Sequence, residues 1–201
     1  MSDLHLDPEK MLLSITDGNP LNEQEINYII ELIVRFLDTT SLARPPSIDD
    51  LYSYIRVLAK AHAYKSKSTL ESLLEYHDTL TAALVLETLC LEWKFFDEYI
   101  ERVIQFAVGV SWDPEEDLKQ IALKILGEFL FDSMSAKISK KPNYIVLETL
   151  TTKELLALDF LYTSFYDSTL EFWSRQTAYY GLCRAVGIPW EVLPAECVAL
   201  D

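Results

Sequence analysis

The chain has 201 residues, half of them apolar, which is enough to form a sizeable hydrophobic core in one large domain or two small ones. Its formal net charge is −15, from 32 acidic and 17 basic residues, so a nonspecific grip on the phosphates of a nucleic acid is disfavoured. It contains only five glycines and eight prolines, which argues against a turn-rich all-β fold, and no apolar run approaches the roughly 20 residues of a membrane span.

The cysteines and the first residues bear on the cellular compartment. Cys90, Cys183 and Cys197 show neither metal-ligand nor paired spacing, so we interpret them as reduced thiols. The first ten residues lack the basic and apolar regions of a signal peptide. We therefore expect a cytoplasmic protein with no membrane contact.

Capping signals predict two helices before residue 47. Asp7, followed by Pro8 and Glu9, begins a short first helix, and Asn22 with Glu25 begins a second. The prolines at 45 and 46 then break the chain. We expect residues 1–46 to form amino-terminal capping helices.

Further helices are predicted from residue 47 to Gly109. Ser47 with Asp50 and Ser68 with Glu71 form capping boxes, and Asp78 begins another helix. The next helix runs from about residue 95 to 108 and stops at Gly109.

The stretch from Trp112 to Phe131 predicts the central helix of the chain. Asp113 is its expected cap, with Pro114 in the first turn and Glu116 closing a capping box. Its apolar stripe comprises Leu118, Ile121, Ala122, Ile125, Leu126 and Phe129, which leaves Lys119, Lys124 and Glu128 for the other side. Ala122 and Gly127 should let a neighbouring helix approach closely.

A polar insertion over residues 132–144 precedes the last two helices. Thr151 with Glu154 forms a capping box, and Ser168 with Glu171 begins a helix that ends at Gly187. That helix is expected to bury Phe172, Thr177, Ala178, Leu182 and Ala185. A short acidic tail occupies residues 188–201. Because no segment sustains alternation of apolar and polar residues, we predict an all-α fold.

Three helices share one pattern, consisting of a small or β-branched residue, an apolar residue, a leucine and a small residue. The copies are Val85-Leu86-x-x-Leu89-Cys90, Ala122-Leu123-x-x-Leu126-Gly127 and Ala178-Tyr179-x-x-Leu182-Cys183. Repeated helix pairs of this size bury their faces by stacking on one another. Any amphipathic bundle can also show such a pattern by chance.

On these residues, 47–187 resembles divergent bacterial HEAT-like repeats. AVGVSWDPEEDLKQIALKILGEFL is similar to the turn and second helix of one unit, although Lys119 replaces the usual Arg, and TLEFWSRQTAYYGLCRAVGIPWE carries a basic residue at Arg175. The resemblance implies stacked antiparallel helix pairs in a short α-solenoid, within a single all-α domain over residues 1–201. An irregular multi-helix bundle is the alternative.

No motif for catalysis is present. The three histidines are scattered, and no H-E-x-x-H, C-x-x-C, G-x-S-x-G or glycine-rich phosphate loop occurs. We therefore expect no catalytic residues, no metal and no cofactor, and hence no enzyme.

The acidic residues concentrate between Lys67 and Met134, where 14 acids and five bases give a local charge of −9. Stacked helix pairs offer extended surfaces for partners, and aromatic residues beside charge are typical of binding hot spots. The residues predicted to contact a partner are Glu71, Glu75, Asp78, Trp93, Asp97, Glu98, Glu101, Trp112, Asp113, Glu116 and Asp117.

We therefore expect a cationic protein partner. Size, charge and general character resemble immunity proteins, which would imply neutralisation of a basic toxin domain, such as a nuclease. Three alternatives stay open: a HEAT-type scaffold or adaptor, an enzyme with an acidic cleft, and acids that only keep the surface solvated.

Overall fold

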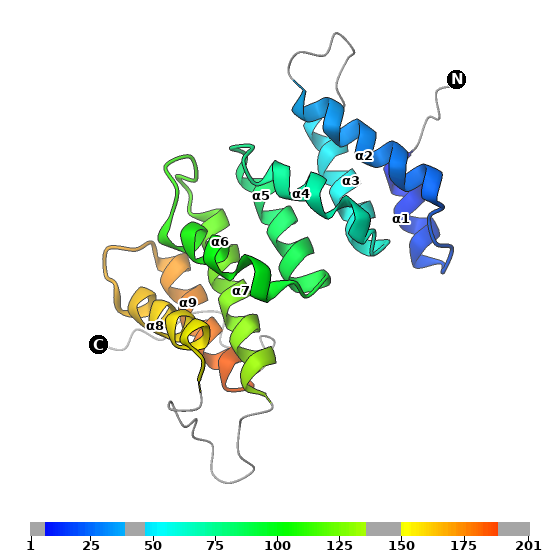
Figure 1. Ribbon diagram of the computed structural model, residues 1–201. Helices are drawn as coiled ribbons and strands as arrows, with labels where there is room; N and C mark the ends of the chain where they lie inside the picture. Colours follow the sequence, from blue (N-terminus) through cyan, green and yellow to red (C-terminus); the bar gives the residue numbers. More distant parts are fainter. Residues whose placement is uncertain (1–6, 39–46, 136–149, 189–201) are drawn as a thin grey trace. The chain divides into compact units, whose positions relative to one another are not determined.

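A computed structural model describes residues 7–38, 47–135 and 150–188. All regular secondary structure in these ranges is helical, which confirms the predicted all-α class (Figure 1). The helices group into two compact units, residues 1–94 and 95–201. The predicted insertion from residue 136, the tail from residue 189 and Cys197 lie outside the described residues.

Unit 1 contains five α-helices and two short helical turns within its described residues. They are α1 (Pro8–Thr16), α2 (Glu23–Leu37), α3 (Ile48–Lys60), the 3₁₀ turn η1 (Tyr64–Ser66), α4 (Lys67–Leu73), α5 (Thr79–Leu86) and the π-helical turn η2 (Glu87–Glu92). Helix α3 is central, with Leu51, Ile55 and Leu58 fully buried, and it packs against α1, α2 and α5. The helices predicted to cap the amino-terminal end thus share a unit with α3, and the division falls after residue 94, not after residue 46.

Unit 2 contains α6 (Phe96–Val108), α7 (Asp117–Met134), α8 (Thr152–Tyr166) and α9 (Phe172–Ala185) in its described residues. Helix α7 packs most extensively against α9 and also against α6 and α8. The closest approach joins two glycines: a Cβ atom added at Gly127 would lie 2.6 Å from the Gly181 Cα atom. This confirms the prediction that Gly127 lets a neighbouring helix come close. Stacking of helix pairs along the whole chain stays a prediction.

Most of the predicted helix starts are confirmed. Asp7 and Asp78 cap α1 and α5, and the reciprocal hydrogen bonds of a capping box are present at Asn22, Ser47 and Thr151. At the other end of the chain, Gly187 has φ +89°, and the Ile188 amide donates to the Cys183 carbonyl at 3.0 Å. This Schellman geometry confirms the predicted stop of α9.

Three predicted capping boxes are wrong, and one of them is that of Glu116, which is itself the N-cap residue of α7 and makes no side-chain capping bond. Ser68 lies inside α4, which begins at Lys67, and α9 begins at Phe172 after Glu171 with no side-chain cap. Phe172 is 46% exposed, although the sequence pattern placed it in the core. Cys90 and Cys183 are both buried, as expected of packing residues, and burial raises the pKa of Cys90 to about 12.

Candidate protein-binding surface

The residues predicted to bind a partner are divided between the two units. Glu71, Glu75, Asp78 and Trp93 belong to unit 1, and the other seven belong to unit 2. Each unit therefore has to be assessed as a binding surface by itself.

Asp78 has a structural role in unit 1. Its Oδ2 atom accepts hydrogen bonds from the Thr81 amide at 2.8 Å, the Thr81 hydroxyl at 2.7 Å and the Tyr52 hydroxyl at 3.1 Å. Burial of Tyr52, together with its hydrogen bond to Asp78, raises the pKa of the phenol to about 12. Asp78 thus holds the start of α5 against α3 through its Oδ2 atom.

The prediction that Trp93 contacts a partner is also corrected by the structure. Its side chain is only 4% exposed, its Nε1 donates to the Ala59 carbonyl at 3.2 Å, and its ring meets Tyr64 edge-on with centroids 5.2 Å apart. A buried indole cannot anchor a partner, so Trp93 belongs to the core. Of the other predicted residues of unit 1, Glu75 is exposed and Glu71 is half-buried.

Unit 1 also contains a pocket of about 400 Å³ beside η2. Its apolar wall comes mainly from Leu12, Ala59 and Leu84, and its polar side chains are Arg56, Lys60, Glu87, Thr88 and Glu92. Lys60 and Glu92 form an ion pair at 3.1 Å. With two bases and two acids, the pocket gives no electrostatic preference for a cationic partner.

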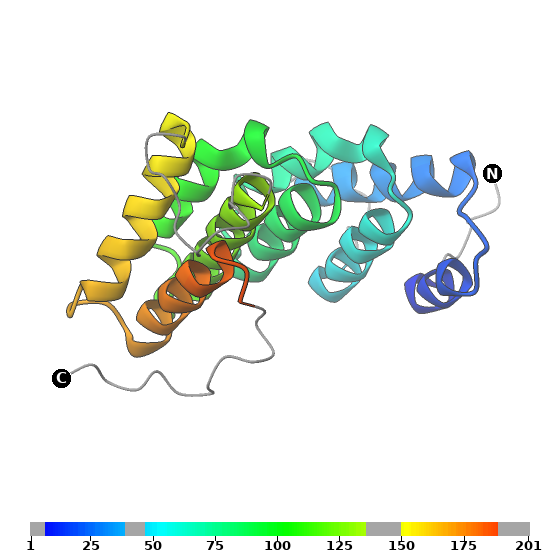
Figure 2. The ribbon, with the colours of Figure 1, turned by 90° about the horizontal axis from the view of Figure 1, so that it is seen from below.

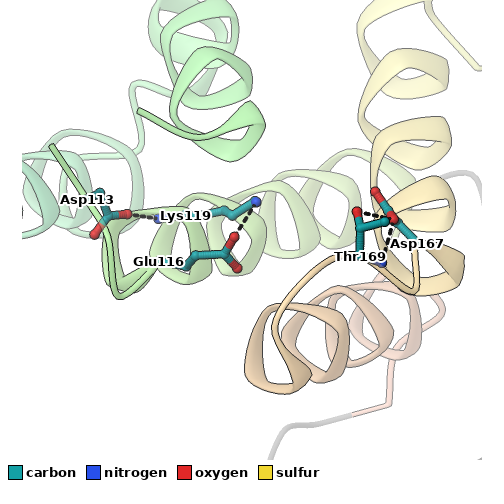
Figure 3. Close-up of polar contacts among 5 residues, drawn as sticks. All are labelled: Asp113, Glu116, Lys119, Asp167 and Thr169. Carbon is teal, nitrogen blue, oxygen red and sulfur yellow. Dashed lines mark hydrogen bonds and ion pairs between the residues drawn. The ribbon is translucent and has the colours of Figure 1, made fainter. Parts of the chain in front are cut away.

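In unit 2, Asp113 and Glu116 form the turn before α7, which begins three residues later than the sequence predicted (Figure 3). Asp113 is buried, and its Oδ2 atom accepts from the Lys119 amide at 3.1 Å. Asp113 therefore caps the amino-terminal end of α7, although it lies four residues before the first residue of the helix. Glu116 adopts the left-handed conformation with φ 57° at the N-cap position.

Lys119 lies in the core, not on the solvent side that the sequence pattern gave it. Its ammonium is 2.8 Å from Glu116 Oε1, and the side chains are 7% and 21% exposed. Burial by itself would raise the pKa of Glu116, but the hydrogen bond from Lys119 and the neighbouring Ser174 hydroxyl lower it below its usual value. Asp113 and Glu116 thus form a buried junction and are not available to a partner.

The turn between α8 and α9 lies near this junction. Asp167 Oδ1 accepts from the Thr169 amide at 2.9 Å and from its hydroxyl at 2.6 Å (Figure 3). These bonds lower the pKa of Asp167, and the positive charges of Lys119 and Arg175 lower it further. Since Lys119 acts on both Glu116 and Asp167, the start of α7 and the α8–α9 turn share one end of unit 2.

The other predicted residues of unit 2 are accessible. Asp97, Glu98 and Glu101 are exposed on the first turns of α6, and Asp117 is exposed at the start of α7. Trp112 is half-buried, with its ring 6.1 Å from that of Phe106.

The most exposed charged side chains of unit 2 are almost all acidic. Among its described residues, the exposed acids are Asp97, Glu98, Glu101, Glu115, Asp117, Asp132, Asp159, Asp167 and Glu171, whereas Lys153 is the one exposed base. The exposed charged residues of unit 1 are more mixed, with acids at Glu9, Asp17, Glu23, Glu31, Asp38, Asp49, Glu75 and Glu92 and bases at Lys10, Arg35, Arg56, Lys60, Lys65 and Lys94. When the half-buried and buried residues are included, the described parts of the two units carry the same formal charge of −7, from 14 acids and seven bases in unit 1 and 13 acids and six bases in unit 2.

Sequence reasoning missed the outer face of α8. Four of its large apolar or aromatic side chains are between 41% and 59% exposed, whereas such side chains usually pack in the core: Leu155, Leu156, Tyr162 and Tyr166. The inner face instead buries Glu154, Ala157, Leu161 and Ser164, and the Glu154 carboxylate accepts hydrogen bonds from Ser133 and from the Thr151 amide. The sequence does contain a signal for this second apolar face. The apolar residues of α8 occur all around the helix, which is typical of a helix that is covered on both faces.

Within the described ranges, no group of three or more His, Cys, Asp or Glu side chains is arranged to hold a metal ion. None of the helices described is both long and apolar enough to cross a membrane.

Comparison with protein-family models, with curated proteins and with solved structures found no match to this chain. The resemblance to HEAT-like repeats and to immunity proteins therefore remains an expectation from the sequence.

Proposed function

We propose that this protein binds a cationic protein stoichiometrically and is an immunity protein that neutralises a basic toxin domain in the bacterial cytoplasm, with no catalytic activity of its own. The observation that supports the proposal is the charge of unit 2, where nine exposed carboxylates face one exposed lysine among the described residues.

An excess of like charge on one unit has a defined physical consequence. It attracts a partner of opposite sign during diffusion and raises the association rate constant by about 10- to 1,000-fold over that of an uncharged pair. Salt screens this attraction over roughly 8–10 Å at physiological concentration, so exposed acids within that distance of one another attract a partner together. Asp97, Glu98 and Glu101 on α6 are close enough to do so.

The packing of α7 against both α6 and α9 favours a second candidate, a HEAT-type scaffold or adaptor without a toxin partner. The two candidates differ in what the partner does by itself. A toxin arrests growth when it is expressed alone, and an adaptor's partner does not.

The test is co-expression with the product of the gene adjacent to the one for this chain. We expect the two proteins to co-purify in a 1:1 complex at physiological salt, and we expect the neighbour to arrest growth unless this protein is present. A 1:1 complex with a harmless neighbour would favour the adaptor. Absence of any interaction by calorimetry would contradict the immunity function.

A charge-reversal variant tests the contribution of unit 2. We expect the triple variant D97K/E98K/E101K to slow association about 10-fold or more, because it removes the attraction that steers the partner. The matched control is E9K/D17K/D49K in unit 1, where the same change in net charge should slow association much less. Association that ignores both salt and these reversals would show that the acids only solvate the surface.

A further inference from the structure

Helix α8 is apolar on two opposite faces. Its inner face packs on α7 and α9, with Leu161 and Ala157 fully buried. Its outer face carries Leu155, Leu156 and Tyr162, all exposed. A helix at the surface of a protein normally has one polar side, so the outer face of α8 is unusual for a surface that meets only water.

The outer face forms one continuous stripe. Leu155, Asp159, Tyr162 and Tyr166 follow one another at spacings of four, three and four residues, which places them in line along the helix. Leu156 lies about 100° around the helix from Leu155 and flanks the stripe, and the rings of Tyr162 and Tyr166 contact each other with centroids 4.8 Å apart. From Leu155 to Tyr166 the stripe is about 17 Å long, since each residue of a helix adds about 1.5 Å. Figure 2 shows α8, in yellow, at the edge of unit 2 with neighbouring helices on one side only.

Acidic residues surround this stripe. The Lys153 ammonium donates to the Asp97 carbonyl at 2.9 Å, which places the acidic first turn of α6 beside the start of α8. Asp159 lies in the middle of the stripe, and Asp167 follows its end. The complementary surface is therefore an apolar strip with basic residues at its centre and edges.

We propose that the outer face of α8 is the docking surface for an amphipathic helix of a cationic partner. The apolar side of that helix covers Leu155, Leu156 and Tyr162, and its Arg or Lys residues pair with Asp159 and lie against the tyrosine rings. The charge of the partner rests on the proposed function. A second copy of this chain fits less well, because a two-fold contact would bring the acids of both copies together.

The first experiment uses the full chain with ¹³C-methyl-labelled leucine and two synthetic 18-residue helical peptides. Both peptides carry a leucine stripe, flanked by Arg and Lys in one and by Glu in the other. The basic peptide should shift the methyl resonances of Leu155 and Leu156. It should leave those of Leu13 and Leu80, which are equally exposed leucines of unit 1, unchanged. Equal shifts in both pairs, shifts in neither, or equal effects of the two peptides would overturn the proposal.

The second experiment uses single variants of the outer face. Leu156→Asp, beside the stripe, and Tyr162→Asp, within it, should each weaken the binding of the basic peptide about 10- to 100-fold, as expected of residues that the bound helix buries. Leu13→Asp and Leu80→Asp should change the affinity less than about 2-fold, as is usual for substitutions outside an interface. Since all four residues are exposed, circular dichroism should show the wild-type helix content in every variant.

The same variants separate this inference from the proposed function. If the neighbouring gene product binds the wild type and both α8 variants equally well, the docking surface is wrong and the immunity function stands. If the basic peptide depends on α8 while no neighbouring product binds, the docking surface stands and the function is wrong. A dimer in sedimentation that Leu156→Asp dissociates would assign the face to a second copy and overturn the proposal.

Discussion

The crossing of α7 and α9 predicts opposite behaviour for two glycines that lie in the middle of helices. A Cβ atom at Gly127 would meet the backbone of Gly181, at 2.6 Å from Cα and 3.1 Å from the carbonyl oxygen. A Cβ atom at Gly181 would instead meet the end of a side chain, Leu161 Cδ2 at 3.0 Å, which has to give by only a few tenths of an ångström. Only the Gly127 substitution therefore forces two helix backbones apart.

Two opposing effects set the change in the free energy of unfolding for each substitution. Replacing a helical glycine with alanine stabilises the folded state by about 1 kcal/mol through backbone entropy. Overpacking costs about 1–3 kcal/mol. The upper end of this range applies to Gly127, because backbone atoms cannot repack. Separating the two helices by about 0.5–1 Å would also weaken the other contacts along their crossing. We expect Gly127→Ala to destabilise unit 2 by about 2 kcal/mol and Gly181→Ala to change its stability by less than about 1 kcal/mol.

The assay is urea denaturation of the two variants and the wild type, followed by circular dichroism and, for unit 2 separately, by hydrogen exchange of the amides of α7 and α9. Hydrogen exchange is needed because two units can unfold in separate steps. A Gly127→Ala variant as stable as Gly181→Ala, with unchanged exchange in α7, would refute the close approach of the two backbones.

Three further predictions concern buried polar groups and a thiol. Glu116→Gln leaves the Lys119 charge buried without its partner and should cost about 3 kcal/mol at pH 7. Because the pKa of Glu116 is lowered in the folded state, this contribution is fully present above its unfolded pKa of about 4.3 and is lost as the pH falls through the lower folded pKa, so pH-dependent urea titrations of wild type and variant should converge only below that folded value. Asp78→Ala removes the cap of α5 and should cost about 1–2 kcal/mol in thermal unfolding, while ultraviolet titration should show the Tyr52 pKa falling from about 12 toward 10. With its pKa raised to about 12, Cys90 should react with a thiol reagent at pH 8 roughly 1,000-fold more slowly than a free thiol, and labelling at the rate of a free thiol would show that its helix is misplaced.

The starts of several helices were predictable from the sequence because each depends on residues only three positions apart. Asn22 with Glu25, Ser47 with Asp50 and Thr151 with Glu154 make their capping hydrogen bonds without help from the rest of the fold. The same reasoning failed at Ser168, since α9 begins at Phe172 without any side-chain cap. At Asp113 it found the right cap but the wrong first residue, because the carboxylate reaches an amide six positions away.

The all-α class was likewise determined by the sequence, because helical spacing of apolar residues is a local property of the chain. What only the tertiary structure decided is which apolar and charged residues meet solvent. Trp93 and Lys119 are buried because other segments supply the Ala59 carbonyl and the enclosure around Glu116, whereas Tyr162 and Tyr166 are exposed because the described helices of unit 2 pack on the other side of α8. Burial depends on which distant segments pack together. The candidate binding surface therefore became visible only in the folded chain.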